Sequence, residues 1–123
     1  MWTGKHVLLG ISGGIAAYKT PELVRLFIKA GAEVKVVSTP AALAFVSRLS
    51  LETVSKNPVC DDLFAPYNPS KTEHIALVDW ADLFVIAPAT ANVLGKMANG
   101  IADDALTTIY LACAKPVFAA PAM

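Results

Sequence analysis

The stretch that most constrains this chain covers residues 6–17, HVLLGISGGIAA. A short apolar run at residues 7–9 leads into a turn of glycine and serine, and a helical pattern begins immediately afterwards. This order gathers several backbone N–H groups and a helix N-terminus around one point. Unpaired N–H groups and the helix dipole both favour negative charge. The stretch therefore predicts an anion-binding site at the end of a strand.

Apolar runs typical of strands alternate with helical patterns along the rest of the chain. Strands are expected at residues 7–10, 34–38, 83–87 and 117–120, and helices at residues 15–30, 40–47, 50–56, 72–80, 90–99 and 103–114. This alternation predicts an α/β fold with a parallel sheet between two helical layers, a three-layer αβα arrangement. Pro21 predicts a break near Thr20, and Pro88 is expected to end the third strand. Ser50 and Thr72 are expected to cap helices.

The composition excludes several classes of function. Ten acidic and ten basic residues balance, so there is no electrostatic footprint for nucleic acid or an anionic membrane. Two cysteines far apart, without a CxxC motif, argue against a metal site and a disulfide scaffold, and they indicate a reducing, cytoplasmic compartment. The apolar stretch at residues 105–123 is cut by Lys115 and Pro116, which favours a helix followed by a strand over a membrane span.

The chain is unusually apolar for its length. Of its 123 residues, 55% are hydrophobic, and the mean hydropathy is +0.54. A domain this small has much surface for its volume, so we expect partner subunits or further chain to cover part of it. Met123 directly follows a predicted strand, before a helix could return to cover that strand, which predicts an incomplete domain.

Three kinds of anion site could explain the turn at residues 10–14. It matches the G-x-S-x-G nucleophile elbow, with Ser12 as nucleophile, but only nine residues precede it to supply an oxyanion donor, and the later histidine, His74, comes before most of the sheet. A dinucleotide site needs G-x-G-x-x-G and an acid after the second strand, where this chain has Ser38 and Thr39. Hydroxyls at that position suit the phosphate of a mononucleotide.

A purely structural explanation of the turn remains open at this point. Gly13 and Gly14 could simply form a tight turn, and Ser12 and Ser38 could cap helices, so the turn alone does not decide. A second strand end favours a ligand site, because PATAN at residues 88–92 places small residues and hydrogen-bonding groups at another helix start. Small side chains there let a planar ring approach the backbone, although Asn92 could also be an ordinary helix cap.

Four motifs together resemble one protein family. They are ISGGIAAYK at residues 11–19, HIAL at 74–77, PATAN at 88–92 and PAM at 121–123. In this order they resemble the homo-oligomeric flavin-containing cysteine decarboxylases, and most of all the phosphopantothenoylcysteine decarboxylase domain of the bacterial bifunctional coenzyme A biosynthesis flavoprotein. The resemblance covers essentially all of residues 1–123 and implies one FMN-binding decarboxylase domain with a Rossmann-like flavoprotein fold.

The resemblance implies a set of site residues and a reaction. FMN would contact Gly13, Gly14, Ile15, Ser38, Thr39, Thr90, Ala91, Asn92, Val93 and Ala122. His74 matches the family's active-site histidine, a residue type suited to proton transfer near neutral pH. The implied reaction is the FMN-dependent oxidative decarboxylation of 4′-phosphopantothenoylcysteine to 4′-phosphopantetheine. His6, at the start of a strand, is interpreted as structural.

The resemblance also implies partners and a continuation of the chain. Flavin sites in this family lie at subunit interfaces of trimers, so a homo-oligomer is expected. A substrate-binding asparagine and a clamp with a cysteine would follow Met123, and residues 1–123 alone are not expected to complete the reaction. Two alternatives remain: a non-catalytic or regulatory flavin-binding module, and a flavin prenyltransferase of similar fold. Peptidyl-cysteine decarboxylases share much of the pattern, so the acyl-cysteine substrate stays open.

Overall fold

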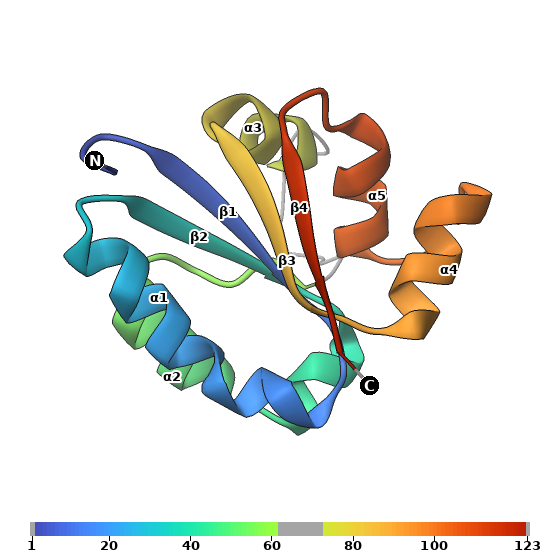
Figure 1. The fold of residues 1–123 in the computed structure, drawn as a ribbon, viewed down its shortest axis with the longest axis horizontal. Helices are drawn as coiled ribbons and strands as arrows, with labels where there is room; N and C mark the ends of the chain where they lie inside the picture. The colour runs from blue at the N-terminus through green and yellow to red at the C-terminus, as the bar shows by residue number, and fades with distance from the viewer. Residues whose placement is uncertain (1, 62–72, 123) are drawn as a thin grey trace.

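A four-stranded parallel sheet forms the centre of the molecule (Figure 1). The structure, a computed structural model, describes residues 2–61 and 73–122. The strand order is β2-β1-β3-β4, and the paired strands all run parallel. The strands are β1 (His6–Ile11), β2 (Glu33–Ser38), β3 (Leu83–Ala89) and β4 (Val117–Pro121). The expected parallel α/β sheet is confirmed.

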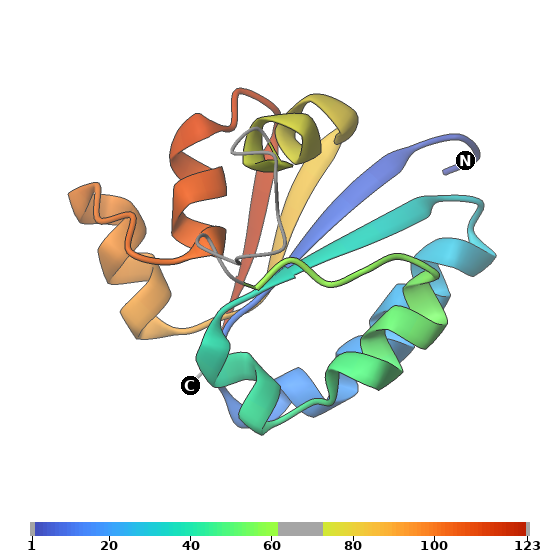
Figure 2. The same ribbon diagram turned by 180° about the vertical axis from the view of Figure 1, so that it is seen from behind.

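Helices cover both faces of this sheet. They are η1 (Ile15–Lys19) and η2 (Pro40–Ala44), both of the 3-10 type, with α1 (Thr20–Lys29), α2 (Arg48–Ser55), α3 (Glu73–Trp80), α4 (Ala91–Asn99) and α5 (Ala105–Ala112). Helices α1 and α2 lie on one side of the sheet, and α3, α4 and α5 lie on the other, as the two opposite views show (Figures 1 and 2). The expected three-layer arrangement is therefore correct.

Each face of the sheet has its own apolar core. Val7, Leu9 and Ile11 of β1 join a cluster that includes Val24 of α1, while Leu8 points into a second cluster with α3, α4 and α5. All of these side chains are fully buried. Burying a side chain of this size contributes about 1.5–3 kcal/mol. Burial on both faces explains why β1 is a continuous apolar run rather than an alternating one.

The first expected helix is divided into two. Residues 15–19 form the 3-10 helix η1, and α1 begins at Thr20 with Pro21 in its first turn. The break predicted near Thr20 is confirmed. Proline fits this position because the first N–H groups of a helix have no partner within the helix.

Two expected boundaries are wrong. Ser47, not Ser50, caps α2: its hydroxyl accepts a hydrogen bond from the Ser50 N–H at 3.0 Å. Strand β3 runs on through Pro88 to Ala89, because its pairing with β4 shifts register between Ile86 and Ala89. A proline is tolerated where the ladder of hydrogen bonds is interrupted in this way. The cap expected at Thr72 lies outside the described residues.

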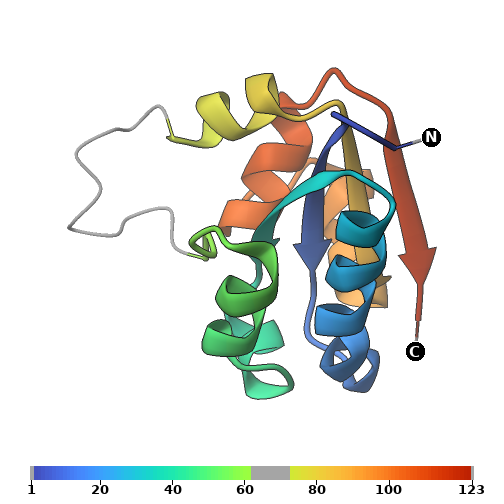
Figure 3. The same ribbon diagram turned by 90° about the vertical axis from the view of Figure 1, so that its left-hand side faces the viewer.

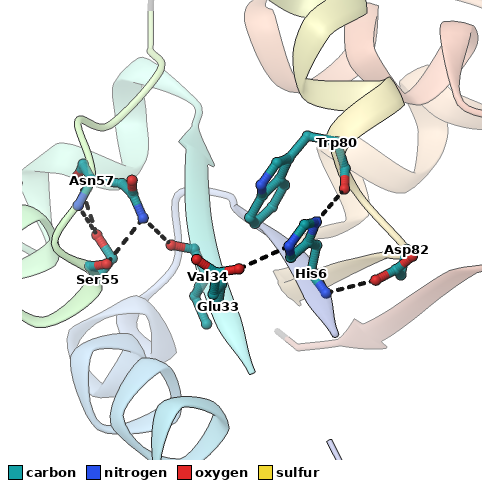
Figure 4. Close-up of polar contacts among 7 residues, drawn as sticks. All are labelled: His6, Glu33, Val34, Ser55, Asn57, Trp80 and Asp82. Carbon is teal, nitrogen blue, oxygen red and sulfur yellow. Dashed lines mark hydrogen bonds and ion pairs between the residues drawn. The ribbon is translucent and has the colours of Figure 1, made fainter. Parts of the chain in front are cut away.

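Polar contacts fix the end of the sheet where the strands begin (Figure 4). The ring nitrogens of His6 lie 2.8 Å from Trp80 O and 2.8 Å from Glu33 Oε2, and the ring stacks on Trp80 with centroids 4.5 Å apart. The His6 backbone N–H donates to Asp82 Oδ2 at 2.8 Å. These contacts tie β1 to β2 and to the end of α3, which agrees with the structural role expected of His6.

Candidate cofactor site

Three short segments meet at the opposite end of the sheet, where the strands finish. Residues 12–14 follow β1, Ser38 and Thr39 end β2, and residues 90–93 follow β3. The register places Ile11 beside Ser38 and Gly10 beside Ile86, so these segments are neighbours in space. Ligands of open α/β sheets bind at this edge. The site-residue expectations at 13–14, 38–39 and 90–93 therefore fall on one region of the molecule.

Close packing requires glycine at position 13. A Cβ atom there would lie 2.6 Å from Ala41 Cβ and 3.1 Å from the Ala41 carbonyl carbon, closer than real Cβ contacts. A Cβ atom at Gly14 would lie 3.4 Å from Thr90 Cγ2, an ordinary contact. Gly14 precedes η1, and no side chain caps this helix start. The turn is therefore tightly packed and presents backbone groups in place of side chains.

Ser38 carries the most unusual polar atom of the site. Its side chain is fully buried, and its Oγ has no hydrogen-bond partner among the described residues. Leaving a buried hydroxyl unpaired costs about 1–3 kcal/mol. The neighbouring Thr39 hydroxyl accepts from the Ala42 N–H at 3.3 Å and caps η2. Ser38, rather than Thr39, therefore has a hydroxyl to spare for a ligand.

The segment at residues 90–93 begins helix α4. Thr90 is its cap, since its hydroxyl accepts from the Val93 N–H at 3.3 Å. The alternative that Asn92 is the cap is wrong; Asn92 is exposed in the first turn, beside exposed Ala91. The Val93 side chain is buried in the core and anchors the segment there. Ala91 and Asn92 are thus the accessible side chains of this segment.

Ser12 joins the first and third segments. Its hydroxyl donates to Pro88 O and accepts from the Thr90 N–H at 3.0 Å, while its own N–H donates to Pro88 O at 3.3 Å. The side chain is buried, with 1% of its surface exposed. Its single proton is already committed to a carbonyl, and this geometry does not present Ser12 as a nucleophile. The elbow interpretation, disfavoured on the sequence, therefore gains no support.

A hollow of about 210 Å³ adjoins these segments. It is lined by Ala16, Lys19, Thr20, Leu23, Ala87, Pro88, Ala120, Pro121 and Ala122. The Ala122 N–H donates to Ala89 O at 3.1 Å, which holds the end of β4 against the end of β3. Ala122 thus lies beside the hollow, and its role in closing the site stays a prediction. Lys19, which also lines the hollow, is a cation that the sequence pattern does not single out.

The position of His74 and of a second groove also bears on the site. His74 falls in the first turn of α3, but its side chain lies outside the described part of the structure. A larger groove of about 580 Å³ lies between α1 and α2, and none of the expected site residues lines it.

Among residues 2–61 and 73–122, no group of histidine, cysteine and acidic side chains could hold a metal ion. In the same residues, no helix is long and apolar enough to cross a bilayer.

Comparison with protein families decides the relationship of this chain. A family model described as Flavoprotein matches residues 1–123, the whole sequence. The chain belongs to the flavoprotein family.

Curated relatives of this flavoprotein are bifunctional proteins of coenzyme A biosynthesis. The protein CoaBC of Bacillus subtilis is 53% identical over 123 residues, which are 100% of this chain and 30% of the relative. CoaBC of Escherichia coli K12 is 52% identical over 120 residues, 98% of this chain and 30% of the relative. The chain therefore spans about 30% of the length of the curated relatives it matches.

Solved structures similar to this flavoprotein include an FMN-dependent cysteine decarboxylase and a PPC decarboxylase. The cysteine decarboxylase SpaF is 35% identical with a TM-score of 0.89, covering 100% of this chain and 71% of that one. A PPC decarboxylase mutant complexed with pantothenoylaminoethenethiol is 41% identical with a TM-score of 0.85, and the match covers 97% of this chain and 67% of that one. The expected resemblance to flavin-containing cysteine decarboxylases and the Rossmann-like flavoprotein fold are confirmed.

Sequence reasoning missed the connecting role of Ser12 in this flavoprotein. Its partners, Pro88 and Thr90, lie 76 and 78 residues away along the chain. The available signal was a serine placed directly after a buried strand. Local patterns do not reveal which backbone groups meet across two strands, so the partners became visible only in the folded chain.

Proposed function

We propose that this chain binds FMN at the carboxyl edge of its sheet and that the whole protein decarboxylates 4′-phosphopantothenoylcysteine to 4′-phosphopantetheine. The observation that carries the proposal is the buried Ser38 hydroxyl, which has no hydrogen-bond partner among the described residues, near a turn too tight for any side chain at Gly13. This is the arrangement expected where a phosphate-bearing ligand completes the hydrogen bonding. The names of the curated and structural relatives supply the cofactor and the substrate.

The residues present fit FMN. Ser38, with the backbone at Gly13, Gly14 and Ile15, would hold the phosphate and the ribityl chain without a cation, because N–H and O–H groups can bind and stabilise a phosphate by hydrogen bonding. Thr39 supports this segment by capping η2. We call the FMN site at this edge the cradle: residues 13–15 with Ser38 and Thr39 form its first side, and residues 90–93 would form its second side. Ala122 would close it. Small residues at 91 and 122 leave room for a planar ring.

The chemistry is divided between the cofactor and the protein. FMN, when bound, would supply reversible two-electron redox chemistry, taking two electrons from the cysteinyl group so that CO₂ can leave and then returning them to give 4′-phosphopantetheine. The chain's own residues bind and orient. His74 is proposed to take up and return a proton at the substrate, as a neutral imidazole can near pH 7. The buried strand ends of β1 and β3 keep water from the inner side of the cradle.

We also propose that the protein works as a homo-oligomer, a trimer or a multiple of one, in the cytoplasm. Ile15 is 71% exposed and Leu49 is 74% exposed, and Tyr18 and Phe45 also stand out from the surface. Ile15 and Tyr18 lie on η1, Leu49 on α2 and Phe45 at the C-cap of η2, and large exposed apolar side chains that lie together mark an interaction surface. A second copy that covers this region would lie next to the turn at residues 12–15.

Two measurements test the proposed function. The purified protein, stripped of flavin, is titrated with FMN and followed by visible absorbance and flavin fluorescence; we expect saturable binding. The FMN-loaded whole protein is then assayed for CO₂ release from 4′-phosphopantothenoylcysteine, with His74→Asn as the variant. Binding without CO₂ release would favour the non-catalytic flavin module, and failure to bind FMN would contradict the proposal. Full activity in His74→Asn would show that His74 has no role in the reaction.

A further inference from the structure

We propose that Ser12 is a positioning residue that holds the two sides of the cradle at a fixed spacing. The inference rests on the proposed function, since it concerns how the chain orders itself to bind FMN. Ser12 lies outside the set of residues expected to contact the cofactor. It acts through Pro88, near the end of β3, and through Thr90, the first residue of the opposite segment.

The contacts of Ser12 form a clip between β1 and the end of β3. The hydroxyl is both donor and acceptor: it donates to Pro88 O and accepts from the Thr90 N–H at 3.0 Å. The backbone N–H of Ser12 adds a second bond to Pro88 O at 3.3 Å. Three hydrogen bonds therefore join one residue of the first segment to the start of the third.

The geometry beyond the clip is sensitive to this spacing. Thr90 caps α4, so a shift of its backbone moves the first turn of that helix, including Ala91 and Asn92. On the other side, Gly13 is already in close contact with Ala41, and Gly14 faces Thr90 Cγ2. The first segment cannot adjust freely, because it is held between η2 and Thr90. Loss of these hydrogen bonds would therefore displace the second side of the cradle relative to the first.

The chain offers a matched control in Ser55. Its hydroxyl also has two backbone partners, donating to Asn57 O at 3.2 Å and accepting from the Asn57 N–H at 3.3 Å, and Ser55 is 4% exposed. It lies at the end of α2, where the Asn57 amide also donates to Val34 O (Figure 4). Val34 is near the start of β2, whereas the cradle lies where the strands end. Both serines are buried hydroxyls with similar partners, but only Ser12 connects the two segments.

The experiment compares Ser12→Ala with Ser55→Ala. Each variant is purified, its folding is checked by circular dichroism, and its flavin-free form is titrated with FMN. We expect both variants to lower the unfolding temperature, since each loses a buried hydroxyl. Only Ser12→Ala is expected to weaken FMN binding, by about tenfold or more, and to change the visible circular dichroism of bound flavin at saturation. If Ser12→Ala does not fold, Ser12→Cys keeps the shape with a weaker donor and is expected to bind FMN less tightly than the wild type.

The outcomes separate this inference from the proposed function. If the wild type binds no FMN, the proposed function fails and the role of Ser12 fails with it. If the wild type binds FMN and Ser12→Ala binds it as tightly as Ser55→Ala does, the clip is overturned while the proposed function stands. Equal affinity of Ser12→Cys and the wild type would overturn the inference in the same way.

Discussion

Ser38 is the single residue at which stability and ligand binding are expected to oppose each other. Its buried hydroxyl has no partner among the described residues, so Ser38→Ala removes an unpaired polar group. Without FMN, we expect the free energy of unfolding in urea to stay the same or rise by about 1 kcal/mol. FMN affinity, measured by calorimetric titration, is expected to fall, because the substitution deletes a proposed phosphate contact.

The control for Ser38 is a serine whose hydroxyl both donates and accepts a hydrogen bond. Ser47 caps α2 and pairs with Ser50, so Ser47→Ala should lose about 1 kcal/mol of stability and leave FMN affinity unchanged. A Ser38→Ala protein that is clearly destabilised but binds FMN normally would contradict the assignment.

Two glycines are expected to respond in opposite directions to the same substitution. Gly13→Ala forces a Cβ to within 2.6 Å of Ala41 Cβ, and we expect a loss of about 1–3 kcal/mol together with weaker FMN binding. Gly95 lies within α4 with no atom within 4 Å of its would-be Cβ, so Gly95→Ala should gain about 0.5–1 kcal/mol. Urea unfolding of both variants checks the signs, and a neutral Gly13→Ala would contradict the close packing of the turn.

At the scale of the elements, the start of β1 should make the fold sensitive to acid. The hydrogen bond from the His6 backbone N–H lowers the pKa of Asp82 from its ordinary value of 3.8, and the charges of Lys5 and Lys115 act in the same direction. The folded state therefore holds the carboxylate form more strongly than the unfolded chain does. This contribution is present above the ordinary pKa and is lost as the pH falls through the lowered one.

The acid sensitivity is measurable with one substitution. Urea unfolding between about pH 2.5 and pH 6 should show a shallower fall in stability toward acid for Asp82→Asn than for the wild type. Asp79→Asn is the control, because it removes a carboxylate from neighbouring α3 that does not bond to the His6 N–H. Identical pH profiles for Asp82→Asn and the wild type would show that Asp82 does not contribute to the acid sensitivity of the fold.

The elements also show how far the sequence alone predicts this fold. The four strands were placed to within two residues, because strands buried on both faces are apolar runs that stand out between helices. The end of β3 was missed because the passage through Pro88 depends on an irregular register with β4, which no local pattern encodes. The cradle is a prediction from glycines and hydroxyls at strand ends, whereas the Ser12 clip depends on partners 76 and 78 residues away along the chain.

For the whole molecule, the position of α3 bears on the proposed role of His74. Helix α3 lies beside the end of the sheet where the strands begin, with Trp80 stacked on His6, while the cradle lies where the strands end (Figure 3). We therefore expect His74 of one protomer to serve the cradle of another. Mixed oligomers of His74→Asn and a cradle variant such as Gly13→Ala should recover decarboxylation that neither variant has alone. Mixed oligomers as inactive as their parents would contradict shared sites.

The central claim is that FMN lies in the cradle at the carboxyl edge of the sheet. The most direct measurement is a crystal structure of the protein grown with FMN. The account predicts flavin density against residues 13–15, with the phosphate at Ser38 and the ring beside residues 90–93. Flavin seated instead in the groove between α1 and α2, away from Ser38, would contradict it.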